Sequence, residues 1–197
     1  MDKASLKTSE ILEELELLRS EIKVVLPYTR GMWGTETDQG NRHFPNTIHG
    51  FMMAAMAKVD YLSQHWIRKR PKGKHKDGQT KRMVQFMHSY LGYGKEASEI
   101  AVQFFRHNLM HTSDLAEIHD DKGGSYRWLL HHGDGSNLPR GCHMQLKGEI
   151  LNFGLLYFVN DLISAIPKLA QSMKTDPEIV AGWAGTESEI RSFEKKF

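Results

Sequence analysis

The chain has 197 residues, 40% hydrophobic and 25% charged, which is typical of one globular domain with a sizeable core. Its net charge of +2, counted with neutral histidines, excludes a strongly basic nucleic-acid-binding protein, so any surface for a polyanion has to be local. The single cysteine, Cys142, excludes an internal disulfide. The acidic N-terminus excludes a signal peptide, and the lack of an apolar run of roughly 18 residues excludes a membrane span. We therefore expect a soluble cytoplasmic protein.

Two amphipathic helices are predicted in the first third of the chain. Apolar residues recur at alternating spacings of three and four over residues 9–25, which predicts a first helix that Pro27 stops. The same spacing over residues 47–66 predicts a second helix with Asn46 as its N-cap. Residues 28–46, rich in Gly, Thr and Asn, are predicted to form a long loop between them.

A strongly basic stretch follows the second helix. Residues 68–82 read RKRPKGKHKDGQTKR, in which eight of fifteen residues are Lys or Arg. Interspersed Pro and Gly predict an exposed linker between helices. Such a run attracts a phosphate backbone by counterion release, although it could equally be a solvated loop without a ligand. The candidate RNA-binding residues in it are Arg68, Lys69, Arg70, Lys72 and Lys74.

Further helices are predicted over residues 83–91 and 95–110, on either side of Gly92-Tyr93-Gly94. Asp114 and Glu117 form a capping pattern that predicts a short helix over residues 114–119, so the preceding helix is expected to end near His111.

The period changes from helical to alternating over residues 125–146, where Gly-rich turn residues separate two alternating runs and predict a β-hairpin. Residues 149–173 are the most hydrophobic segment and predict a central helix that Pro167 kinks or divides. The expected fold is all-α: an up-and-down bundle of four to five main helices with a small inserted β-hairpin, in one domain over residues 1–197.

The end of the predicted helix over residues 95–110 gathers chemically capable side chains. Arg106 stays charged and can bind two phosphate oxygens at once, while His111 titrates near neutral pH and can serve as acid or base. In a regular helix these two residues lie about 140° apart. A site made from both therefore requires a loosened last turn or a contribution from a second subunit.

The segment Arg106-His107-Asn108-Leu109-Met110-His111, together with the apolar helix before it, resembles the signature of the HEPN superfamily, in which an Arg is followed by a polar residue and, a few residues later, by a His. The resemblance implies a helical, metal-independent endoribonuclease that needs no cofactor. Arg106 would stabilise transition-state charge, His111 would be the acid or base, and His107 and Asn108 would assist. It also implies a homodimer with a composite site, and an antitoxin or nucleotidyltransferase as a partner.

Three alternatives remain open. His107 and His111, about 40° apart on a regular helix, could bind a metal, as in the helical-bundle hydrolases of the DinB type that the chain resembles in outline. The chain could be a HEPN-like module that binds RNA, a nucleotide or a partner without turnover. Alternatively, Arg106 pairs with a carboxylate and His111 is a satisfied histidine at the edge of the core. Further ligands for a metal could come from His43, His49 or His88.

Overall fold

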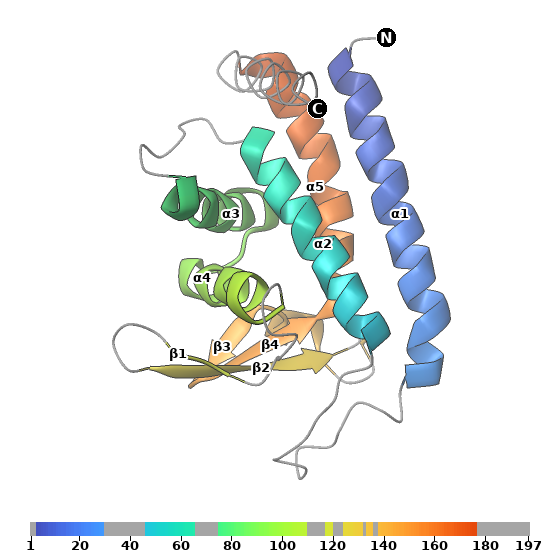
Figure 1. Ribbon diagram of the computed structural model, residues 1–197. Helices are drawn as coiled ribbons and strands as arrows, with labels where there is room; N and C mark the ends of the chain where they lie inside the picture. Colours follow the sequence, from blue (N-terminus) through green and yellow to red (C-terminus); the bar gives the residue numbers. More distant parts are fainter. Residues whose placement is uncertain are drawn as a thin grey trace, which may run out of the picture.

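The chain is mainly helical, and its helices lie on one face of a small sheet (Figure 1). The computed structural model describes residues 3–29, 46–65, 75–109, 117–119, 124–131, 133–135 and 138–176. The helices are α1 (Lys3–Thr29), α2 (Asn46–His65), α3 (His75–Leu91), α4 (Lys95–Gln103), a π-helix (Phe104–Leu109), a 3-10 turn (Arg140–Cys142) and α5 (Leu155–Thr175). The strands are β1 (Ile118–His119), β2 (Ser125–His131), β3 (Gln145–Lys147) and β4 (Ile150–Gly154). Within these ranges no helix is both long and apolar enough to cross a bilayer.

The sheet differs from the predicted β-hairpin over residues 125–146. Its strand order is β1-β2-β4-β3, and β2 pairs in parallel with β4, while β3 pairs antiparallel with β4. The alternating pattern identified β2 and β3 as strands but assigned them the wrong partners, because alternation reports only which face of a strand is buried. β4 was missed since Leu151 to Gly154 are all buried, so the strand does not alternate, and its mainly apolar sequence runs directly into the start of α5.

Several predicted boundaries are also wrong. α1 continues past Pro27 to Thr29. α5 is one helix that contains Pro167, so the alternative in which Pro167 divides the segment is wrong, and flanking turns and tertiary packing outweigh a single lost N–H. Residues 75–82 belong to α3 rather than to a linker. Residues 118–119 form β1 rather than a helix, and residues 114–116 of that predicted helix lie outside the described residues.

Aromatic rings join the helices to the sheet. Phe104, fully buried in the π-helix, stacks on Trp128 of β2 with ring centroids 4.4 Å apart and an interplanar angle of 12°. Trp128 meets the edge of Phe153 on β4, which in turn packs on Phe158 of α5. This column of rings continues through the core and fixes the position of the π-helix over the sheet.

Two glycines allow the start of α5 to lie against the loop after β2. A Cβ on Gly154 would lie 2.8 Å from Cδ2 of Tyr157 and 3.0 Å from Cα of Gly133. Gly133 has a positive φ of 73°. A Cβ on Gly133 would lie 2.9 Å from the backbone carbon of Gly154 and 2.9 Å from the backbone nitrogen of Tyr157. Small residues are therefore required on both sides of this contact.

We expect Gly154→Ala to lower the free energy of unfolding by about 1–3 kcal/mol, because the new methyl group overpacks this contact. Gly50→Ala is the matched control, since Gly50 lies inside α2 with no atom within 4 Å of the added methyl group, and it should raise stability by about 0.5–1 kcal/mol. Urea unfolding of the two variants measures both changes. Equal stability of the two variants would show that the Gly133–Gly154 contact is not tight.

Candidate functional site

The π-helix carries the first residue of the candidate site. A π-helix closes hydrogen bonds between residues five apart, is rare, and occurs frequently at functional sites. Here it begins with the buried Phe104 and Phe105 and then presents Arg106, which is half-buried. Nη1 of Arg106 donates a hydrogen bond to Oγ1 of Thr80, at 3.3 Å. Thr80 lies on α3, so this bond connects two helices.

The positive charge of Arg106 is not neutralised within the described part of the chain. Its hydrogen-bond partner there is the uncharged hydroxyl of Thr80, and no ion pair joins it to a described carboxylate. Among the residues described, the alternative in which Arg106 pairs with a carboxylate therefore finds no support. A guanidinium with unused N–H groups can bind an oxyanion.

The other predicted site residues are only partly described. His107 and Asn108 belong to the π-helix, but the structure does not describe their side chains. His111 lies outside the described residues, as do the predicted RNA-binding residues Arg68, Lys69, Arg70, Lys72 and Lys74. Thr80 was not predicted as part of the site, because the sequence places it in a basic stretch that reads as a linker. Only the helical position of α3 brings its hydroxyl to Arg106.

The described residues contain no group of three or more His, Cys, Asp or Glu side chains that could hold a metal ion. His88, one of the predicted additional ligands, uses its Nδ1 for a 2.8 Å hydrogen bond with the carbonyl of Tyr93. The side chains of His43 and His49 lie outside the described set, as does that of His107.

A second polar cluster, which the sequence did not reveal, lies where the α3–α4 loop, the sheet and α5 meet. The backbone N–H of Gly154 donates to Nδ1 of His143 at 3.0 Å, so the neutral ring carries its proton on Nε2. Nε2 then donates to the hydroxyl of Tyr93 at 3.0 Å, and that hydroxyl donates to Oδ2 of Asp161 at 2.5 Å. Arg140 pairs with the other oxygen of Asp161.

Burial determines the protonation of this cluster. His143 is enclosed by aromatic rings, and this burial, followed by the nearby cations Arg140 and His131, lowers the pKa of His143 to about 3. Burial and the Asp161 carboxylate raise the pKa of Tyr93 well above its usual value. Near neutral pH His143 is therefore neutral and the Tyr93 hydroxyl keeps its proton. In these states the hydrogen bonds of the cluster join the α3–α4 loop, the end of β4 and α5.

Comparison with known proteins gives no relative from which a role could be taken: no family model, no curated protein and no solved structure matches the chain.

The buried His143 should make stability depend on pH. The pKa of a histidine is about 6.5 in an unfolded chain, whereas that of His143 in the folded protein is lowered to about 3. Below about pH 6.5 the unfolded state therefore binds a proton that the folded state does not. We expect this group to contribute a fall in unfolding free energy, with a slope of up to about 1.4 kcal/mol per pH unit, as the pH drops from about 6.5 toward 3.

Urea unfolding across this pH range measures the slope. His143→Gln should flatten it relative to the unmodified protein, because glutamine does not titrate. Lys168→Gln, which replaces an exposed cation on α5 that does not titrate in this range, is the control and should retain the slope. A profile that His143→Gln leaves unchanged would mean that His143 is not a buried neutral histidine.

Proposed function

We propose that the chain is a metal-independent endoribonuclease of the HEPN type. In this proposal Arg106 binds the scissile phosphate and stabilises the charge that builds up in the transition state. His111 acts as the acid or base on the attacking 2′-hydroxyl or the leaving oxygen, and His107 and Asn108 assist by positioning the substrate. The up-and-down bundle and the homodimer with a composite site belong to the same proposal, as does an antitoxin or nucleotidyltransferase partner.

The observation that carries the proposal is the environment of Arg106. Its described hydrogen-bond partner is the hydroxyl of Thr80, which fixes the side chain without cancelling its charge. Arginine is almost never fully buried unless it is paired, and the described residues offer half-buried Arg106 no carboxylate. A cation that is oriented and yet not neutralised is suited to bind a phosphate.

The local winding at Arg106 differs from that of a regular α-helix. The chain adopts a π-helix from Phe104 to Leu109, in which hydrogen bonds close between residues five apart. A regular α-helix would leave Arg106 and His111 about 140° apart, so the proposal requires a departure from it before His111. His111 itself lies outside the described residues.

The position of α3 supports a role for the basic stretch. Thr80 lies five residues after His75, the first residue of α3, which corresponds to about 7–8 Å along the helix axis. Residues 68–74, which lie outside the described residues, precede this end of α3 in the sequence. Their cations can raise the local concentration of RNA where the proposed chemistry takes place.

The proposal predicts that the purified protein cleaves single-stranded RNA in the presence of EDTA. Arg106→Ala and His111→Ala should each reduce the cleavage rate by about 100-fold or more, since each removes a group that acts in the transition state. Gel-resolved cleavage of a labelled oligonucleotide measures both rates. Lys95→Ala, which removes an exposed cation at the start of α4, is the control and should cleave at the normal rate.

Other outcomes would favour the alternatives. The protein would be a metal-dependent hydrolase if EDTA abolished cleavage, and if the purified protein held stoichiometric metal that His107→Ala lost. Salt-sensitive RNA binding without any cleavage would replace it by a non-catalytic module.

A separate prediction concerns the basic stretch. Replacing Arg68, Lys69, Arg70, Lys72 and Lys74 by serine should weaken RNA binding and flatten its dependence on salt, because fewer counterions are released. Fluorescence anisotropy at several salt concentrations measures both effects. Serine at Lys168 and Lys174 on α5 is the control for the loss of charge alone. Unchanged RNA affinity in the basic-stretch variant would exclude this role.

A further inference from the structure

The outer face of α1 combines acidic and apolar side chains. Ile11, Leu15, Leu18 and Ile22 are buried on its inner face. On the opposite face Leu17 is 61% exposed, and Glu13 and Glu21 lie four residues before and after it. Residues four apart are neighbours on one face of a helix, so the three form a line with a leucine between two carboxylates. Val24, 67% exposed, extends the same face.

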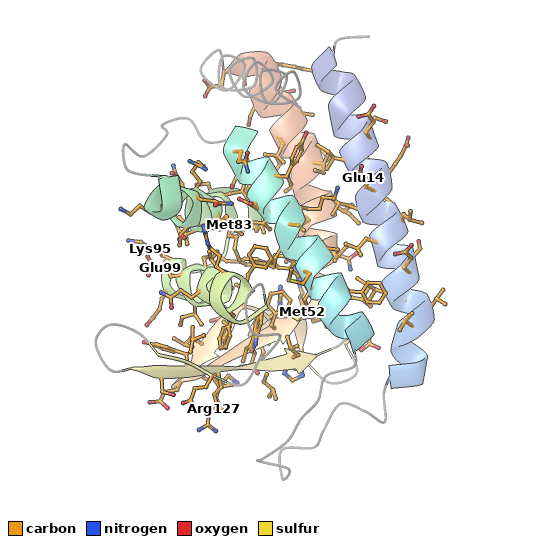
Figure 2. All side chains as sticks on the ribbon, in the orientation of Figure 1. Glu14, Met52, Met83, Lys95, Glu99 and Arg127 are labelled. Carbon is orange, nitrogen blue, oxygen red and sulfur yellow. The ribbon has the colours of Figure 1, made fainter. Side chains whose placement is uncertain are left out.

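The outer face of the sheet has the opposite charge pattern. Trp128 packs inward on Phe104, so its neighbour Arg127 points away from the helices, as Figure 2 shows. Arg127 pairs with Ile150 of β4, and Ile150 pairs with Lys147 of β3. All three side chains are exposed, and Ile150 is 43% exposed. They form a row across three strands with an isoleucine between two cations.

These two surfaces account for every large apolar residue that is exposed in the described part of the chain: Leu17, Val24 and Ile150. Within that part, no ion pair involves Glu13, Glu21, Arg127 or Lys147.

The dimensions of the two surfaces match. Glu13 and Glu21 are separated by about 12 Å along the helix axis. Arg127 and Lys147 are separated by two strand spacings, about 10 Å. Long side chains can accommodate the difference, so two ion pairs can form while Leu17 contacts Ile150.

Among the described elements, the helices lie on one face of the sheet only (Figure 1). The sheet is mixed: β2 and β4 at its centre are parallel, while β1–β2 and β3–β4 are antiparallel. Parallel strands are typically buried on both faces, whereas antiparallel strands can leave one face exposed. A helix laid on the outer face would therefore cover the parallel pair.

We propose that α1 of one copy of this chain docks on the outer sheet face of a second copy. Pairing of like faces would place carboxylate against carboxylate or cation against cation, so the contact joins two different surfaces. Such a head-to-tail contact leaves one surface free at each end and extends beyond a dimer unless it closes into a ring. The contact is independent of the proposed nuclease activity.

Charge reversal tests the proposal on the full chain. One variant carries Glu13→Lys and Glu21→Lys, and the other carries Arg127→Glu and Lys147→Glu. Sedimentation at low ionic strength should show that the unmodified protein associates as its concentration rises. The association constant of each variant alone should be lower by at least about tenfold. An equimolar mixture of the two variants should recover association, because their altered faces again have opposite charge. That recovery would also show that both variants are folded.

Lys168→Glu with Lys174→Glu on α5 is the matched control and should associate like the unmodified protein. A monomeric mass at about 1 mM protein, or a mixture that associates no better than its components, would overturn the proposal. An assembly that stops at two copies and survives both charge reversals would also overturn it, because a two-fold contact through the π-helix that carries Arg106 behaves in that way. RNA cleavage by each variant is measured separately, so failure of the docking contact and failure of the nuclease proposal are distinguishable.

Discussion

The stack of Phe104 on Trp128 is the contact on which the candidate site depends. It attaches the first residue of the π-helix to the sheet, with the rings 4.4 Å apart and nearly parallel. Because Phe104 is fixed, the chain that follows it must place Arg106 two residues further along a widened turn, beside Thr80 of α3. A π-helix is less favourable than an α-helix and persists only where tertiary contacts hold it. The aromatic column supplies those contacts, and the environment of Arg106 is one consequence.

The cluster around His143 performs a related task away from the surface. It joins Tyr93 in the α3–α4 loop, Gly154 at the end of β4 and Asp161 on α5 through consecutive hydrogen bonds. Each buried donor and acceptor in that chain has a partner, so the cluster specifies the geometry without an unpaired polar group. The loop that it fixes leads directly into α4 and the π-helix. The His143 cluster therefore fixes the start of the segment formed by α4 and the π-helix, and the stack of Phe104 on Trp128 fixes its π-helical end.

The sequence predicted those parts of the fold that depend on local pattern. Three-four spacing identified α1 and α2, and the glycines around Tyr93 identified the break before α4. Strand pairing was missed because a buried parallel strand such as β4 has no alternating pattern. Arg106 was chosen as a candidate site residue from its chemistry and position, and its role stays a prediction. Thr80 and His143 could not be found, since their roles arise from contacts with residues far away in the chain, and a single sequence does not report such contacts.

In the proposed reaction an arginine and a histidine act on the RNA's own 2′-hydroxyl, and the ends of the products test this most directly. Attack by the 2′-hydroxyl leaves a 2′,3′-cyclic phosphate on the upstream fragment and a 5′-hydroxyl on the downstream fragment. Mass spectrometry of the fragments from a defined oligonucleotide identifies these ends. We expect a cyclic phosphate, and no cleavage at a position where a single 2′-deoxynucleotide replaces the ribonucleotide. Fragments with a 3′-hydroxyl and a 5′-phosphate, or cleavage at the deoxy position, would contradict it.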